Sequence, residues 1–458
     1  MHKPKIPLLL LTCGVLFFGA ANAQKFTAVQ NYAMNRPGVV MVKTVFSADV
    51  YVNKMKMDDR NFNLLLDSLQ AVDSSGVIFS AEQKLDIVLK RISDNPNRFF
   101  KATLDYIKQP EEITSTGTGF FFTGDGYVAT NCHLIDRDNA YIRRQFILSA
   151  FQQITQANIA ALETSWATSF TEQQRTVLNN TYASVYSRLF SMVLYDLKKE
   201  VFVVYSSNSA GADANSVKKS ASVVIKGQPM PGKDIAILKI DGDSSLPTLK
   251  IADDQLPKVG EQLYVYGYPG PVTNNNFVSQ ESAIEPTLTT GIVSAMKRSV
   301  EGWPLIQMDA NINRGSSGGP VCNEKGEVIG LTTFGSIENN GGLAAGLNFA
   351  IPILILNEYL DTADIKPEAS EASTIFAKGL VAYEKENYRD ALRRFESVKK
   401  LNANYPGLSM YIENCTANLQ KNRNKESAVV WYDLLGFTAI LSLVLFLYFV
   451  VKRTRRTV

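Results

Sequence analysis

The chain has 458 residues, which is long enough for roughly two or three domains. Hydrophobic residues make up 45% and charged residues 20%, the proportions of an ordinary globular protein, so no long disordered stretch is expected. The formal net charge is +3, but the excess lies at the two ends of the chain, at Lys3, Lys5, Lys452, Arg453, Arg455 and Arg456. Without them 41 basic residues face 44 acidic ones, and nothing indicates a nucleic-acid partner.

Residues 1–23 are typical of a secretory signal peptide. Lys3 and Lys5 precede an apolar run over residues 6–18, and small residues at 21–23 form a cleavage site before Gln24. Lipidation at Cys13 is disfavoured, because Thr12 precedes it and the apolar run continues past it. We therefore expect the chain to be exported.

Two segments with helical periodicity interrupt a chain whose pattern up to Pro352 otherwise predicts short strands. Within about residues 54–112, helices are expected over 61–72, over 81–93 behind a Ser80-x-x-Gln83 capping box, and over 98–108. Within 137–199, a helical hairpin is expected over 138–165 and 172–199, the second helix capped by Thr171-x-x-Gln174. Their role is left open between padding, a cap over a neighbouring cleft and an oligomer contact.

A strand, a Gly-Asp-Gly turn and a second strand are predicted over residues 117–133, with a first strand at 37–45. His133 stands at the end of the second of these paired strands. It is the one histidine expected in the mature chain, since His2 lies in the signal peptide. Because histidine exchanges protons near neutral pH, His133 is a candidate general base.

Two further motifs complete a catalytic constellation. Asp234 stands at the start of an apolar strand, and Ser317 lies in the run Gly-Ser-Ser-Gly-Gly-Pro. Glycines permit positive φ, so the N–H groups of Gly315 and Ser317 could form an oxyanion hole. The order His133, Asp234, Ser317 is one that acyl-transfer triads adopt. No cofactor is expected, and no residue spacing indicates a metal.

Residues 201–352 show short strands and Gly/Pro turns, and the period becomes helical after Pro352. Residues 371–419 predict three helices within a segment 368–424. Its Gly379, Tyr383, Tyr388, Ala391, Phe395 and Pro406 resemble about one and a half tetratricopeptide (TPR) repeats. Such a segment would bind a protein partner; the alternative is a helical spacer packed on the preceding domain.

Residues 429–451 are apolar apart from Asp433 and long enough to cross a bilayer. The basic tail 452–458 follows at once, which predicts a single-pass membrane protein with a cytoplasmic C-terminus and its bulk outside the cytoplasm. The mature cysteines are Cys132, Cys322 and Cys415. We favour buried free thiols, although pairing of Cys132 with Cys322 is left open.

The blocks GTGFFFTGDGYVATNCHLI, DIAILKID, YGYPG, TTGIVSAMKR, NRGSSGGPV and GLNFAIP resemble, in this order, those of the trypsin-like serine proteases. The bacterial HtrA/Deg branch is the most similar. The resemblance implies a mainly β, double six-stranded barrel over residues 24–362, with α-helical insertions. It also implies a serine endopeptidase, a hydrolase of protein or peptide substrates in the periplasm, acting in envelope quality control or processing. His133 becomes the base, Asp234 its orienter and Ser317 the nucleophile.

The chain departs from this resemblance in two places. Ser316 stands where the HtrA branch usually has Asn and digestive relatives have Asp, so activation through an ion pair with a trimmed N-terminus is not expected. No PDZ segment is recognisable after Pro352. The competing hypothesis is a catalytically inactive envelope scaffold that binds partners through the TPR-like segment, and a homo-oligomer is left open.

The resemblance also places a specificity pocket on both sides of the nucleophile. Its walls would come from residues 311–314 and 332–335, and the substrate-binding candidates are Ile312, Arg314, Thr333, Phe334 and Gly335. No carboxylate stands at these positions, so a buried Lys or Arg side chain would lack an opposite charge. Ile312 and Thr333 are expected to narrow the space, with Arg314 at the rim. We therefore expect cleavage after small to medium aliphatic residues.

Overall fold

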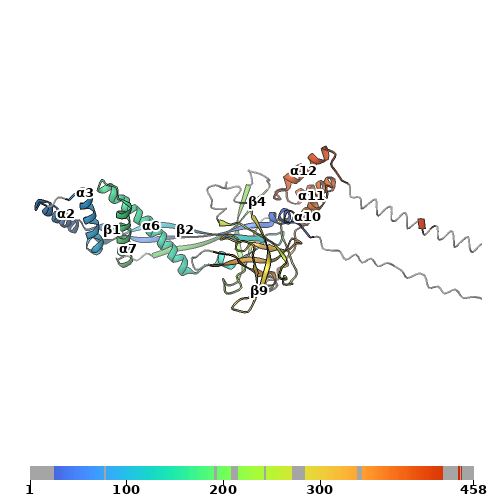
Figure 1. Ribbon diagram of the computed structural model, residues 1–458, viewed down its shortest axis with the longest axis horizontal. Helices are drawn as coiled ribbons and strands as arrows, with labels where there is room; N and C mark the ends of the chain where they lie inside the picture. Colours follow the sequence, from blue (N-terminus) through green and yellow to red (C-terminus); the bar gives the residue numbers. More distant parts are fainter. Residues whose placement is uncertain are drawn as a thin grey trace, which may run out of the picture.

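The computed structural model describes residues 25–76, 79–189, 193–207, 215–241, 244–270, 284–337 and 343–425, with 442, 443 and 445. The predicted signal peptide, the basic tail and nearly all of the predicted spanning helix 429–451 lie outside these residues. Among the described helices, none has the length and apolar character needed to cross a membrane. Figure 1 shows an elongated molecule, with two β-sheets at the centre and helices towards both ends.

The first sheet is a closed antiparallel barrel of six strands in the order β1-β2-β3-β6-β5-β4. The strands are β1 (Val39–Met57), β2 (Phe100–Phe121), β3 (Tyr127–Thr130), β4 (Val193–Ser207), β5 (Asn215–Lys226) and β6 (Ala236–Ile240). Apolar side chains such as Val40, Phe121 and Leu238 fill its interior without exposure. The predicted hairpin around the Gly-Asp-Gly turn is confirmed, since β2 pairs with β3 from Phe121↔Val128 onward.

The second sheet has seven strands in the order β11-β8-β9-β10-β13-β12-β7. They are β7 (Lys250–Ile251), β8 (Gln262–Gly267), β9 (Thr287–Arg298), β10 (Pro304–Met308), β11 (Pro320–Cys322), β12 (Glu327–Ile337) and β13 (Leu343–Pro352). An extra β11–β12 pairing closes six of them into a ring, and β7 lies parallel to β12 outside it. The predicted architecture is thus found as one barrel plus a ring-like sheet. Phe120, Tyr266 and Leu331 belong to the core cluster shared by both sheets.

Strands β1 and β2 continue far beyond the barrel as a ribbon, paired from Val39↔Phe120 to Met57↔Phe100. Helices α2 (Asp59–Ser74), α3 (Ala81–Asp94) and α4 (Pro96–Phe99) join these strands, and α6 (Asn139–Ser165) and α7 (Glu172–Leu189) precede β4. Together they cover the far end of the ribbon around a separate core that includes Val50, Ile92, Phe146 and Tyr182. We call residues 46–113 and 138–194 the helical arm (Figure 1).

Two of the predicted helices are wrong in part. Residues 98–108 lie mainly in β2, and the helix predicted over 172–199 ends at Leu189, with residues 193–199 in β4. The apolar spacing in these stretches fits a helix or a strand, and pairing with β1 decides the outcome, because β1 buries Val50 and Val52 and requires neighbours. Both predicted capping boxes are present, at Ser80–Gln83 and Thr171–Gln174.

The C-terminal region is helical, with α9 (Ile353–Thr362), α10 (Glu371–Glu384), α11 (Tyr388–Leu401) and α12 (Leu408–Gln420), and the N-terminal α1 (Ala28–Asn35) packs against α10. A Cβ atom on Gly379 would lie 2.6 Å from the Phe395 ring, so the glycine allows the α10–α11 contact. The backbone N–H of Thr248 donates to Ser373 Oγ at 2.7 Å, and that of Ser370 donates to Thr248 Oγ1 at 2.8 Å. These contacts fit the packed-spacer alternative; a partner-binding role stays a prediction.

Candidate active site

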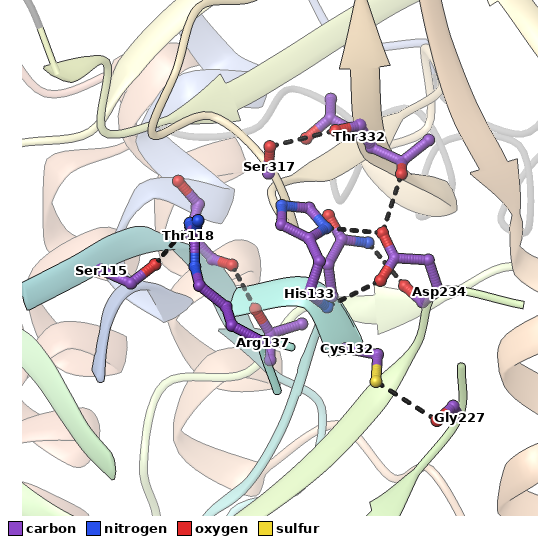
Figure 2. Close-up of polar contacts among 12 residues, drawn as sticks. Ser115, Thr118, Cys132, His133, Arg137, Gly227, Asp234, Ser317 and Thr332 are labelled. Atoms are coloured by element: carbon purple, nitrogen blue, oxygen red, sulfur yellow. Dashed lines mark hydrogen bonds and ion pairs between the residues drawn. The ribbon is translucent and has the colours of Figure 1, made fainter. Parts of the chain in front are cut away.

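His133 and Asp234 meet where β3 and β6 lie side by side. The register Thr130↔Ala236 aligns the end of β3 with the start of β6, and His133 follows in the short helix α5 (Cys132–Ile135). His133 Nδ1 lies 2.6 Å from Asp234 Oδ2, and the His133 backbone N–H donates to Oδ1 at 2.8 Å (Figure 2). Two bonds from one residue therefore fix the ring relative to the carboxylate.

The Asp234 carboxylate is fully buried and is held by a third donor. Thr333 Oγ1 donates to Oδ2 at 3.0 Å, while the Asn131 amide donates to the Asp234 carbonyl at 2.8 Å. A buried charge is stable only when it is paired or hydrogen-bonded, and this set of bonds meets that condition. The Thr333 side chain thus faces the carboxylate, which differs from its expected place on a pocket wall.

Ser317 lies on a tight turn that requires glycine at two positions. Gly315 and Gly318 have φ of +98° and +82°. A Cβ atom on Gly318 would lie 2.2 Å from the Thr118 carbonyl oxygen, and one on Gly315 would lie 2.3 Å from that of Tyr268. The Ser317 hydroxyl donates to the Thr333 carbonyl at 3.0 Å rather than to His133. A rotation about the Ser317 Cα–Cβ bond is needed to direct it elsewhere.

Along this turn, backbone N–H groups that donate a hydrogen bond alternate with groups that do not. The Ser316 N–H donates to the Asn313 carbonyl at 2.9 Å, and the Gly318 N–H donates to the Thr332 carbonyl at 2.8 Å. The N–H groups of Gly315 and Ser317 have no acceptor within the described part of the chain. Two unused donors on one turn can stabilise an oxyanion, and the oxyanion hole predicted from the sequence stays a prediction.

Thr118 on β2 ties the first barrel to this turn, a role that sequence reasoning missed. Its hydroxyl donates to the Gly315 carbonyl at 2.7 Å and accepts the Tyr268 N–H at 3.0 Å. Its backbone N–H donates to the Ser317 carbonyl at 2.8 Å. From the other side, Thr332 Oγ1 donates to the Ser316 carbonyl at 2.5 Å. In the sequence, the only indication of this role is that the Thr118 hydroxyl stands between the two glycines of the Gly-Thr-Gly block.

The remaining predicted pocket residues are not brought together. Ile312 is 7% exposed and packs in the core of the second sheet, whereas Arg314 is exposed to solvent. Phe334 and Gly335 lie in β12, and the Phe334 side chain is outside the description. β11 pairs with β12 only as far as Pro320↔Leu331, and the turn around Ser317 bonds the backbone of Thr332 and Thr333. Beyond Thr333, β12 pairs with β13 alone among the described strands. That open edge could accept an extended peptide.

Cys132, Cys322 and Cys415 are buried and free, which confirms the prediction of unpaired thiols. Burial raises the pKa of the Cys132 thiol to about 12, and its Sγ donates to the Gly227 carbonyl at 3.2 Å. Cys132 is therefore a packing residue despite standing next to His133. Within the described ranges, no group of three His, Cys, Asp or Glu side chains could hold a metal ion.

Residues 117–331 match the family model of the trypsin-like peptidase domain. A probable periplasmic serine endoprotease, DegP-like, from Pseudomonas putida is 40% identical over 126 residues, which are 27% of this chain and 23% of that protein. Its Hahella chejuensis counterpart is 38% identical over 265 residues, 56% of this chain and 38% of that protein. The chain thus aligns with well under half the length of either relative.

Among solved structures, the serine endoprotease from Yersinia pestis is 17% identical with a TM-score of 0.33, covering 74% of this chain and 67% of that one. This score is too low to establish a shared fold. The family model covers the stretch that carries His133, Asp234 and Ser317. Residues 117–331 are accordingly a trypsin-like peptidase domain related to the DegP-like (HtrA) serine endoproteases.

Proposed function

We propose that the chain is a serine endopeptidase that hydrolyses peptide bonds in exported proteins through His133, Asp234 and Ser317. The observation that carries the proposal is the buried Asp234 carboxylate 2.6 Å from His133 Nδ1, beside a nucleophile turn with two unused N–H donors. The relatives are named periplasmic serine endoproteases. Processing or quality control of envelope proteins is the role that fits this setting.

The reaction follows from the placement of each group. The Ser317 hydroxyl turns from the Thr333 carbonyl towards His133 Nε2, which takes its proton as the oxygen attacks the substrate carbonyl. The N–H groups of Gly315 and Ser317 stabilise the resulting oxyanion. His133 then gives this proton to the leaving amine. Water next attacks the acyl-enzyme while His133 takes its proton, and His133 passes that proton to the Ser317 oxygen as the acid product leaves. Asp234 keeps the proton on Nδ1 and stabilises the imidazolium.

The proposal is tested by incubating a reduced, unfolded protein with the purified wild type and with Ser317→Ala. Peptide fragments should accumulate only with the wild type, because Ala lacks the attacking oxygen. Equal fragmentation by both proteins would contradict the serine mechanism. Absence of fragments in both would favour the inactive scaffold, in which the C-terminal helices bind a partner.

A preference for small to medium aliphatic residues before the cleaved bond is expected. No carboxylate occurs at positions 311–314 or 332–335. A Lys or Arg side chain there would lose its hydration without gaining an opposite charge. A peptide library should show cleavage after Val, Ala, Ile or Leu. Strong cleavage after Lys or Arg would show that these segments do not form the pocket.

We also propose that the signal peptide is removed and that residues 429–451 anchor the protein in the membrane, with residues 24–428 outside the cytoplasm. The support is the apolar length of the segment and the basic residues that follow it. Protease added to intact spheroplasts should digest the body and spare a tag placed after Val458. Loss of that tag from outside would show the opposite orientation.

A further inference from the structure

Arg137 follows His133 by four residues, and in the view of Figure 2 it is drawn on the side of His133 away from Asp234. Two contacts hold its side chain. Nη2 donates to Ser115 Oγ at 3.1 Å, and the guanidinium carbon lies 5.6 Å from the centre of the Tyr141 ring. The Nε–H is buried and has no acceptor among the described residues. The bond to Ser115 and the contact with Tyr141 thus hold the guanidinium in one orientation.

The positive charge of Arg137 is also not neutralised within the described residues. The adjacent carboxylates are engaged elsewhere: Asp136 pairs with Lys226 at 2.6 Å, and Asp138 accepts the Ala140 N–H at 3.2 Å as the cap of α6. An arginine that is half-buried, unpaired and fixed by its neighbours is suited to bind a carboxylate from outside the chain.

The spacing of two contacts along β2 gives the scale of this site. The Thr118 N–H donates to the Ser317 carbonyl at 2.8 Å, and Ser115, which holds Arg137, lies three residues earlier on the same strand. At about 3.3 Å per residue these positions are about 10 Å apart. An extended substrate would cover that distance with about three residues.

The side of the substrate that reaches Arg137 follows from the two sheets. The open edge of β12 beyond Thr333 belongs to the second sheet and suits the acyl part of the substrate. Arg137 is bonded to Ser115 on β2 of the first barrel and follows His133 by four residues, and His133 delivers a proton to the leaving amine. The leaving-group part of the substrate therefore extends towards Arg137.

We propose that Arg137 forms a subsite for a substrate carboxylate two or three residues after the cleaved bond. The inference rests on the proposed peptidase function. The donors to the carboxylate are Nη1 and the second N–H of Nη2. The hydrogen bond to Ser115 fixes the orientation of the guanidinium, and the Tyr141 ring packs against the guanidinium. The carboxylate is either an Asp or Glu side chain or the C-terminal carboxylate of a short substrate, since both present the same group to the guanidinium.

The test uses the full chain and peptides that differ only in the second and third residues after the cleaved bond, which are Glu or Gln. A further pair ends at the third residue with a free carboxylate or an amide. We expect the wild type to favour each carboxylate peptide about tenfold in kcat/KM, the effect of one charge-assisted hydrogen bond. Whichever pair shows the larger preference identifies the source of the carboxylate.

Arg137→Gln should reduce this preference to about one, whereas the control Arg143→Gln, an exposed position on α6, should keep it. The preference is a ratio measured within each variant, so a general loss of activity does not affect it. An equal preference for the carboxylate peptides in the wild type and in Arg137→Gln would overturn the Arg137 subsite but not the peptidase function. Failure of the wild type to cleave any peptide would overturn the peptidase function with it, and the two failures are therefore distinguishable.

Discussion

Replacing Asp234 with Asn should lower kcat by about 10⁴-fold while the protein stays folded. Oδ1 accepts the His133 backbone N–H, and Oδ2 accepts from Nδ1 and Thr333. An amide has one oxygen, so if that oxygen keeps the backbone N–H, its NH₂ group faces Nδ1. The ring must then carry its proton on Nε2, where it can no longer accept the proton of Ser317.

Steady-state kinetics on one peptide would measure this effect, with the thermal unfolding midpoint as the check on folding. Thr333→Val is the matched comparison, since it removes one donor to the same carboxylate but leaves both bonds from His133. We expect it to lower kcat by only about tenfold. An Asp234→Asn variant with more than a tenth of wild-type activity would contradict the assigned role of Asp234.

Thr118→Val should reduce kcat by about 10- to 100-fold with a smaller change in KM. Valine has nearly the same shape, but it leaves the Gly315 carbonyl and the Tyr268 N–H without their partner, and each orphaned group costs about 1–3 kcal/mol. The two lost hydrogen bonds are those that hold the turn carrying Ser317 and the oxyanion donors. Because those donors act in the transition state, the loss should appear mainly in kcat.

Thr44→Val provides the control. Thr44 is a fully buried threonine of β1 in the same barrel, but its hydroxyl has no hydrogen-bond partner in the described part of the chain. Removing that group should leave activity unchanged and leave stability equal or higher. Parallel kinetics and unfolding of the two variants would separate the cross-barrel bond from the mere loss of a buried hydroxyl. Similar kinetics for both would contradict the positioning role of Thr118.

Local signals predicted the elements that local chemistry determines. The capping boxes, the Gly-Asp-Gly hairpin and the glycine turn at Ser317 each depend on residues within a few positions of one another. Gly379 and Phe395 stand out through the resemblance to a tetratricopeptide repeat, and the structure brings them close together. For such features the sequence pattern is close to the physical cause.

Features that depend on distant pairing could not be predicted in this way. Residues 98–108 have an apolar spacing compatible with a helix, yet they form a strand because β1 lies beside them. Thr118 meets Gly315 across 197 positions, and Thr333 meets Asp234 across 99. Only the packing of the two sheets defines these contacts. For that reason local motifs single out His133, Asp234 and Ser317, whereas the hydroxyls that contact their surroundings could not be predicted.

The most direct test of the peptidase assignment is labelling of the intact protein with a fluorophosphonate, followed by mass spectrometry of the modified peptide. A serine activated by His133 and Asp234 attacks phosphorus, whereas an ordinary serine does not. We predict a single adduct on Ser317 that is absent in Ser317→Ala and strongly reduced in His133→Ala. Folded protein that remains unlabelled, or an adduct on Ser316 instead, would contradict the account.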